Sequence, residues 1–357
     1  MASHFFMMHA IHRVVFSVAL ATLAGCVSQV RNYGADDHFS NSEASSGSTS
    51  TVSHCATIPD SVWVEGADFH ECIRYYPSQG FVPKQTPRAI VFMAGDVAAG
   101  ADKIYSSYAN GTPSKSLEAA RQEATRDALP YLILARPGTD GSSGAQSRRR
   151  TRYETSVVNA ALDKIKARYG IQTYGLVGQS GGGGLVGALV AERRDVWCAV
   201  PSSGVLAVVF RAREKGRHTD VTGTEFSLVW DPIDQISRIR PMPGFRMFLT
   251  SSPDDSDVSF ASQHEYAMAA QKAGLPVYQI SVRGTGGSHH RTFGVGNRVV
   301  QACMSGLSTD YILKRFAGMR NVSGAENIPD DSQSMDELAA KIRQMAVDWQ
   351  ASGKPVR

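Results

Sequence analysis

Residues 176–185 read LVGQSGGGGL and place a single serine, Ser180, between a short apolar run and four consecutive glycines. Each glycine destabilises a helix or strand by roughly 0.5–1 kcal/mol relative to alanine, so the run needs a conformational reason. The pattern is G-x-S-x-G at a strand-to-helix junction, where the serine occupies a sharp turn. Gly178 and Gly182 are the positions at which a side chain would collide with the adjoining strand and helix. We therefore predict that Ser180 is a nucleophile presented on a tight turn.

The rest of the 357-residue chain alternates between apolar runs and helical patterns. The apolar runs are residues 88–95, 131–138, 173–180, 195–204, 245–252 and 276–284. Continuous apolar runs are typical of strands buried on both faces of a parallel sheet. Strands that alternate with helices predict right-handed crossovers in one α/β domain, which we place at residues 56–320.

Other segments complete this domain. Residues 61–78 predict an antiparallel hairpin around a Gly-Ala-Asp turn, and helical spacing over 149–170 and 259–274 ends at a glycine in each case. The arginines within 148–152 are interpreted as the solvated start of a helix, with an acidic or phosphate-bearing partner as the alternative. Residues 204–243 leave room for one helix and a loop, hence little or no lid. Residues 321–357 form an extension with an amphipathic helix over 334–350, which we expect to dock on the domain.

Two polar loops follow strands in the second half of the chain. Residues 253–263 read PDDSDVSFASQ and residues 285–294 read TGGSHHRTFG. Each lies just beyond the carboxyl end of a predicted strand, where open α/β sheets place their sites. A serine hydroxyl is a poor nucleophile at neutral pH and needs a base, which an acid must orient. The two loops supply both residue types.

With the serine turn, these loops resemble the α/β-hydrolase family over residues 60–315, nearest to its prolyl-oligopeptidase-like and dienelactone-hydrolase-like branches. The resemblance implies the chain order Ser, Asp, His. The acid is often written as Asp, two residues, then Val, which favours Asp255, with Asp254 and then Asp257 as alternatives. The usual spacing of glycine, small residue and histidine favours His289 as the base, with His290 as the alternative.

The resemblance also implies two oxyanion donors. One is the backbone N–H of Gly181, the residue after the nucleophile, at a helix N-terminus where partial positive charge accumulates. The other is the N–H that follows Gly95, namely that of Asp96, or of Val97 next along. A carboxylate beside an oxyanion is unfavourable, so the Asp96 side chain is expected to point away.

The activity implied is that of a serine hydrolase that cleaves carboxylic esters through an acyl-enzyme. A peptidase acting on small peptides and a non-catalytic binding lipoprotein of the same fold are the alternatives. A phosphate-binding loop would need Lys-Ser/Thr after the glycines, where Leu185 and Val186 stand. The formal charge of +4 is mild and no basic face runs through the sequence, so no nucleic-acid partner is expected. No cofactor and no metal is implied, and the sequence does not indicate an oligomeric state.

The N-terminus indicates export. Residues 1–25 lack acidic side chains and contain an apolar stretch too short to span a bilayer, as in a secretory signal. LAGC at 23–26 resembles the bacterial lipobox, which implies removal of residues 1–25 and a lipid on Cys26. Residues 26–55, rich in Ser and Thr, predict a flexible tether between a membrane anchor and the domain. The expected location is the bacterial cell envelope.

Four further cysteines agree with an oxidising compartment, since an even number permits two disulfides. Cys55 and Cys72 are the favoured pair because they are close in sequence, which leaves Cys198 with Cys303. Buried free thiols are the alternative.

Overall fold

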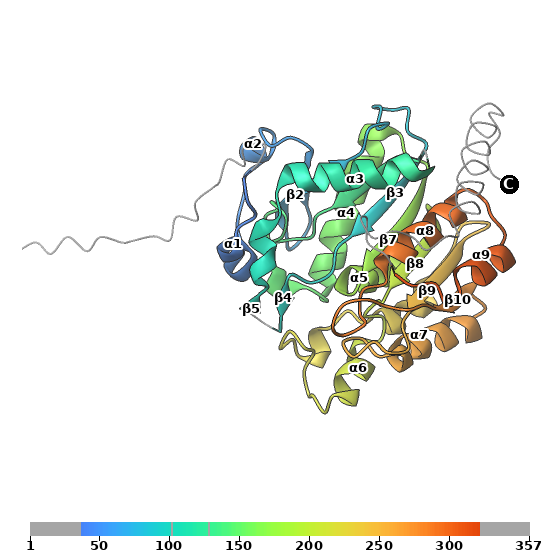
Figure 1. Ribbon diagram of the computed structural model, residues 1–357. Helices are drawn as coiled ribbons and strands as arrows, with labels where there is room; N and C mark the ends of the chain where they lie inside the picture. The colour runs from blue at the N-terminus through green and yellow to red at the C-terminus, as the bar shows by residue number, and fades with distance from the viewer. Residues whose placement is uncertain (1–36, 101–102, 128, 322–357) are drawn as a thin grey trace, which may run out of the picture.

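A computed structural model describes residues 37–100, 103–127 and 129–321, and shows a central sheet flanked by helices (Figure 1). The sheet has eight strands in the order β1-β2-β6-β3-β7-β8-β9-β10. Their bounds are β1 (Ser61–Glu65), β2 (His70–Pro77), β3 (Arg88–Met93), β6 (Tyr131–Leu134), β7 (Thr173–Gln179), β8 (Val196–Ser202), β9 (Arg246–Ser251) and β10 (Val277–Ser281). A separate short ribbon pairs β4 (Ala98–Ala99) with β5 (Lys103–Ile104).

Strand direction follows the apolar patterns. The strands from β6 to β10 in the sheet order pair in parallel, whereas β1 and β2 pair antiparallel and β2 is antiparallel to β6. Every residue of β8 is buried, as expected of a strand covered on both faces. The six apolar runs and the hairpin predicted from the sequence are confirmed as strands, and so is the mixed α/β fold with a mostly parallel sheet.

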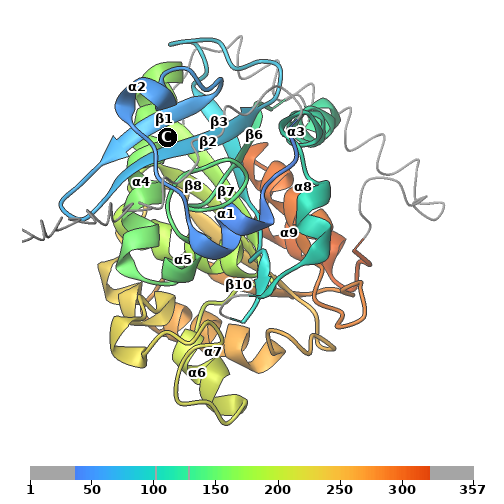
Figure 2. The same cartoon turned by 90° about the vertical axis from the view of Figure 1, so that its left-hand side faces the viewer.

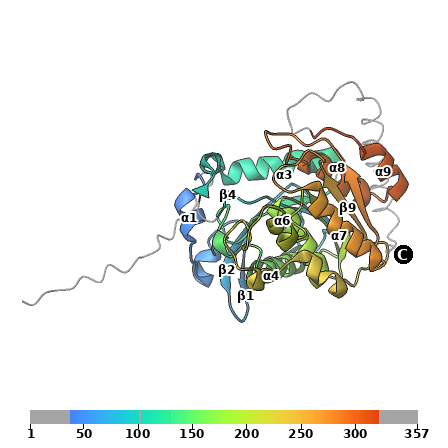
Figure 3. The same ribbon diagram turned by 90° about the horizontal axis from the view of Figure 1, so that it is seen from below.

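Helices cover both faces of this sheet, as the view from below shows (Figure 3). One face packs against α4 (Arg152–Tyr169), α5 (Gly181–Glu192) and α7 (Phe260–Lys272). The other packs against α3 (Pro113–Asp127), α8 (Phe293–Met304) and α9 (Thr309–Phe316). The predicted end of α4 is confirmed, since Gly170 caps it with a left-handed φ of 75°. No helix among the described residues has the length and apolar character needed to cross a membrane.

The connection between β8 and β9 contains α6 (Val208–Glu214) and two 3-10 helices, η3 (Phe226–Leu228) and η4 (Pro232–Arg238). The side chain of Asp231 accepts hydrogen bonds from the backbone N–H groups of Val208 and Val209, both at 2.9 Å. These bonds satisfy N–H groups in the first turn of α6 that have no intrahelical acceptor. The predicted helix and loop between these strands are therefore present, with two short 3-10 turns in addition.

Residues 37–55 correct one expectation. They were predicted to belong to a flexible tether, but they form α1 (Asn41–Ser46) and α2 (Val52–Cys55) against the body (Figure 2). Phe39 is buried and stacks on Tyr108 at 5.9 Å between ring centroids, and its N–H donates to the Gly111 carbonyl. The buried ring of Phe39 and the backbone pairing of Ser48 with Gly144 thus help to hold a segment whose composition is mostly polar. Cys26 and the helix predicted over 334–350 lie outside the described residues.

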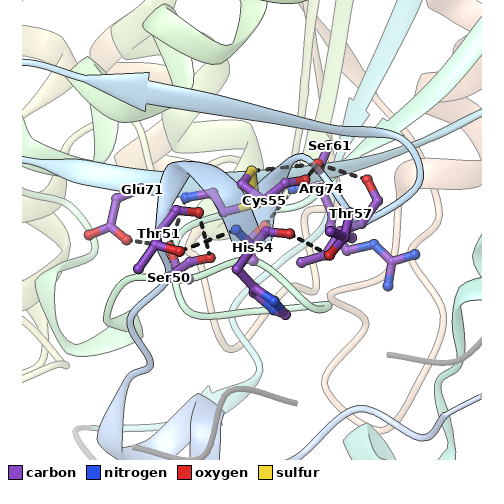
Figure 4. Close-up of a disulfide and its surroundings, with 12 residues drawn as sticks. Ser50, Thr51, His54, Cys55, Thr57, Ser61, Glu71 and Arg74 are labelled. Carbon is purple, nitrogen blue, oxygen red and sulfur yellow. Dashed lines mark hydrogen bonds between the residues drawn. A yellow bond between two sulfur atoms is a disulfide. The ribbon is translucent and has the colours of Figure 1, made fainter. Parts of the chain in front are cut away.

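Both predicted disulfides are confirmed. Cys55 at the end of α2 bonds to Cys72 in β2, with 5.5 Å between Cα atoms (Figure 4), and Cys198 in β8 bonds to Cys303 in α8. Around the first disulfide, the Ser61 hydroxyl donates to the Cys55 carbonyl at 2.7 Å. This bridge joins the N-terminal segment covalently to the sheet, so it supports the folded position of α2.

Candidate active site

Ser180 lies at the junction of β7 and α5 with a backbone φ of 56° and ψ of −118°. A positive φ is unfavourable for a residue with a side chain, so surrounding structure must hold it. The N–H of Ser180 donates to the Ser202 carbonyl at 2.9 Å, and its own carbonyl accepts from the N–H of Val205 at 3.1 Å. The side chain remains partly exposed. The structure therefore places Ser180 on the strained turn that the sequence predicts.

The surrounding glycines occupy positions that cannot hold a side chain. A Cβ atom on Gly178 would lie 2.4 Å from the Gly182 carbonyl oxygen, and one on Gly182 would lie 2.2 Å from the Met93 carbonyl oxygen. Cβ atoms on Gly183 and Gly184 would also approach backbone atoms of the loop after β8, to 2.8 and 2.5 Å. The glycine run is therefore a consequence of close backbone packing around the turn.

The loop that contains the aspartates (residues 253–263, the acid loop) and the loop that contains the two histidines (residues 285–294, the histidine loop) are joined by a short hydrogen bond. Nδ1 of His290 lies 2.8 Å from Oδ2 of Asp255, whose side chain is completely buried. The other oxygen, Oδ1, accepts from the backbone N–H groups of Asp257 and Val258, each at 2.9 Å. Because an ionised carboxylate only accepts, Nδ1 must carry the proton in this pair when the imidazole is neutral. That tautomer leaves Nε2 of His290 as an unprotonated base.

The structure corrects the histidine favoured by the sequence. Residues 285–291 form a small hairpin closed by two backbone hydrogen bonds between Thr285 and Arg291. His289 stands near its end with a left-handed φ of 53°, and its side chain is exposed. One residue on, His290 is only partly exposed and pairs with Asp255. The left-handed residue reverses which neighbour faces inward, and motif spacing does not reveal such a turn.

The acid loop has three aspartates, and the structure separates them. Asp254 and Asp257 are exposed, whereas Asp255 is buried against His290. Asp257 has a different contact, since its Oδ2 accepts from the Ser288 hydroxyl at 2.8 Å. Asp255 is thus the carboxylate in position to orient the imidazole, and Asp257 links the acid loop to the histidine loop.

Gln179 connects the histidine loop to the serine turn. It is the last residue of β7, directly before Ser180, and its Nε2 donates to the His290 carbonyl at 2.8 Å. This contact brings the carrier of the base to the residue next to the nucleophile. The sequence reasoning did not single out Gln179, since the position between glycine and serine in G-x-S-x-G carries no residue requirement of its own.

The loop after β3 lies on the other side of Ser180. A Cβ atom on Gly95 would be 3.2 Å from Cβ of Ser180, so the backbone that leads to Asp96 passes directly beside the nucleophile. Gly181 is the first residue of α5, and its N–H therefore has no intrahelical acceptor. Both predicted donor residues, Gly181 and Asp96, are thus next to Ser180 in space.

The carboxylate of Asp96 is held by arginines from a distant part of the sequence. Oδ1 accepts from Arg136 at 3.0 Å, and Oδ2 pairs with Arg150 and lies 3.4 Å from Nε of Arg149. Burial by itself raises the pKa of Asp96, but the positive charges of Arg150, Arg136 and Arg149 hold it well below its ordinary value. The arginines therefore compensate the charge of a carboxylate that does not point away from the serine turn, since a Cβ atom on Gly181 would lie 2.1 Å from Oδ1 of Asp96.

Two more buried carboxylates balance the three guanidinium groups. Glu154 pairs with Arg136 at 2.6 Å, and Asp220 pairs with Arg150 at 3.1 Å. We call this set of six side chains the arginine–carboxylate network; its members are Asp96, Arg136, Arg149, Arg150, Glu154 and Asp220. The expectation that the arginines at 148–152 are solvated is wrong for Arg149 and Arg150, which are buried. Their partners are far away in sequence, so no local pattern could identify the network.

Comparisons with solved structures find chains of similar fold at low identity. The chain is similar to the esterase Pf2001 of Pyrococcus furiosus, with 14% identity, a TM-score of 0.48 and coverage of 76% of this chain and 98% of that one. It is also similar to Est1E of Butyrivibrio proteoclasticus, with 11% identity, a TM-score of 0.43 and coverage of 72% of this chain and 98% of that one. A third similar structure is an acylaminoacyl peptidase of Pyrococcus horikoshii, with 13% identity, a TM-score of 0.46 and coverage of 69% of this chain and 40% of that one. The chain therefore spans under half the length of that peptidase. No protein-family model and no curated protein matches the chain.

Proposed function

We propose that the chain is a serine hydrolase that cleaves carboxylic esters through an acyl-enzyme, with Ser180, His290 and Asp255 as its catalytic triad. The observation that carries this proposal is the buried pairing of His290 with Asp255 on a loop bonded to the residue before Ser180. Ser180 follows β7 on a strained turn, and Asp255 and His290 follow the adjacent strands β9 and β10, so all three residues lie beyond the carboxyl ends of strands in one parallel sheet. This is the combination that activates a hydroxyl nucleophile.

In the proposed reaction, Nε2 of His290 takes the hydroxyl proton of Ser180 as Oγ attacks the ester carbonyl. The imidazolium formed is stabilised by Asp255, and the carbonyl oxygen becomes an oxyanion facing the N–H groups of Gly181 and Asp96. Collapse breaks the ester C–O bond, and His290 returns its proton to the leaving alcohol. A water molecule, deprotonated by His290, then cleaves the acyl-enzyme and releases the acid with the serine restored.

A small hollow lies beside Gly181, with room for little more than a water molecule. Its lining includes the apolar side chains of Leu185, Val205 and Val208, next to Arg150 and Glu154 of the network. We therefore expect short acyl esters to be better substrates than long ones.

Labelling with a fluorophosphonate probe tests the proposed function. The folded chain is expected to react at one site, and peptide mass spectrometry is expected to find the phosphonyl group on Ser180. Ser180→Ala should remove the signal. A folded chain that takes up no probe would contradict the hydrolase proposal and favour a binding lipoprotein. Comparing p-nitrophenyl esters of increasing chain length with aminoacyl p-nitroanilides then separates ester from peptide cleavage.

We also propose that the enzyme is exported and anchored to the membrane of the cell envelope through a lipid on Cys26. The supporting observations are the LAGC sequence and the two disulfides, which suit an oxidising compartment. In a bacterial host, the full chain is expected to incorporate labelled palmitate and to fractionate with membranes, whereas Cys26→Ser should do neither. Palmitate incorporation by Cys26→Ser equal to that of the wild type would refute the anchor.

A further inference from the structure

Gln179 makes three hydrogen bonds to the segment that carries the base. Its Nε2 donates to the His290 carbonyl at 2.8 Å, and its Oε1 accepts from the N–H groups of Thr292 and Phe293 at 3.1 and 3.0 Å. The residue is buried, with 8% of its surface exposed. Every one of these bonds joins the side chain to backbone, so they constrain the path of residues 290–293 directly.

Gln179 also lies beside the loop after β3 that contains Gly95 and Asp96. A Cβ atom on Gly95 would lie 3.9 Å from Cγ of Gln179 and 3.4 Å from its carbonyl oxygen. Gln179 therefore joins two parts of the site, the serine turn through the chain and the histidine loop through hydrogen bonds, and it lies next to the loop that contains Gly95. Among the described residues of the site, it is the side chain that joins the nucleophile strand to the backbone of the base.

Only an amide can make this set of contacts. The His290 carbonyl requires a donor, while the N–H groups of Thr292 and Phe293 require an acceptor, and glutamine presents both at the end of one chain. A carboxylate of equal length keeps the acceptor but places an oxygen against the carbonyl. An apolar side chain of equal length leaves two N–H groups and one carbonyl without this partner, at a cost of about 1–3 kcal/mol for each buried group left unpaired.

We propose that Gln179 is a positioning residue that sets the placement of the His290 imidazole relative to Ser180. This inference rests on the proposed function. It has a physical basis in the geometric sensitivity of proton transfer, since a displacement of about 1 Å in a reacting group can cost about 100-fold in rate. Thr292 is anchored to the body independently, because its hydroxyl donates to the Thr250 carbonyl at 3.1 Å. The histidine loop therefore stays attached to the body without Gln179, and what we expect to be lost is the alignment of the His290 imidazole with Ser180.

Two substitutions separate alignment from folding. Gln179→Met keeps the length and loses every hydrogen bond, and it is expected to lower kcat about 10- to 100-fold with KM changed less than about 3-fold. Gln179→Glu retains the acceptor for Thr292 and Phe293, and its kcat is expected to lie between those of Gln179→Met and the wild type. Steady-state kinetics on a p-nitrophenyl ester and the rate of fluorophosphonate labelling measure both effects.

Gln301 provides the matched control. It is a buried glutamine on α8 whose Nε2 donates to the Glu123 carbonyl at 3.1 Å, within the packing of α8 on α3. Gln301→Met should lower the melting temperature without lowering kcat of the folded protein. If Gln179→Met, or Gln179→Glu where the former does not fold, has wild-type kcat, the inference is overturned while the hydrolase proposal stands. A wild-type chain that neither labels nor hydrolyses esters overturns the proposed function instead.

Discussion

His290→Ala is expected to lower kcat for ester hydrolysis by about 10⁴- to 10⁶-fold, a loss as large as that from Ser180→Ala. The reason is that the base and the nucleophile act as one unit. Without the imidazole, nothing removes the hydroxyl proton of Ser180. The His290→Ala variant should therefore be about as slow as the Ser180→Ala variant. Residual turnover above the uncatalysed rate should persist, since the oxyanion donors and substrate binding remain. Single-turnover kinetics on an activated ester measures the effect.

Two further variants make this prediction specific. Ser180→Ala combined with His290→Ala should be no slower than either single variant, because effects within a catalytic unit are not additive. His289→Ala is the matched control one position away, exposed at the hairpin end, and it should change kcat less than about 5-fold. A large loss from His289→Ala together with a small loss from His290→Ala would reverse the assignment of the base.

The histidine assignment shows where sequence reasoning stops. The fold was predictable because buried parallel strands require continuous apolar runs, and each run coincides with a strand. The turn at Ser180 was predictable from G-x-S-x-G at the end of an apolar run, and the position of Asp255 was favoured by the resemblance to the α/β-hydrolase family. The choice between adjacent histidines depends on one left-handed residue, His289, whose φ of 53° arises from the closure of its hairpin.

Long-range contacts explain the remaining differences. The composition of residues 37–55 is typical of a tether, but the ring of Phe39 packs against those of Tyr76 and Tyr108. The local sequence suggests that Arg149 and Arg150 are surface residues, but they pair with the buried carboxylates of Asp96 and Asp220, which lie in distant loops. In both cases a few tertiary contacts outweigh local composition. No window of sequence contains both partners of such a contact.

Asp96→Asn is expected to lower the free energy of unfolding by about 3–5 kcal/mol, because it removes the carboxylate that pairs with buried Arg149 and one of the two that pair with Arg136 and with Arg150. Three arginines contact this carboxylate, and the side chains of Arg136 and Arg149 are 2% and 1% exposed, so water cannot replace the lost charge. Asparagine offers a single carbonyl acceptor and directs its NH₂ group toward donors. Urea unfolding at pH 7 measures the difference.

Asp163→Asn is the matched control. Asp163 also pairs with an arginine, Arg193 at 2.9 Å, but its side chain is 61% exposed. The loss is expected to be about 0–1 kcal/mol, because Asp163 is solvated and Arg193, although buried, keeps its pair with Asp195 at 2.7 Å. Equal losses for the two variants would show that burial of the arginine–carboxylate network does not determine the effect. Because the backbone of Asp96 lies beside Ser180, Asp96→Asn should in addition slow ester hydrolysis in the fraction that remains folded.

The pH dependence of this difference follows from the pKa of Asp96. Burial opposes ionisation, but the charges of Arg150, Arg136 and Arg149 outweigh it and hold the folded-state pKa well below the ordinary value. A carboxyl group with a depressed folded-state pKa stabilises the fold above its unfolded-state pKa of about 3.9 and loses that contribution as the pH falls toward the folded-state value. The gap in stability between wild type and Asp96→Asn should therefore be complete at pH 7 and narrow below about pH 4. A gap that widened with acid would mean that the protonated carboxyl is the form preferred by the fold, contrary to its three arginine contacts.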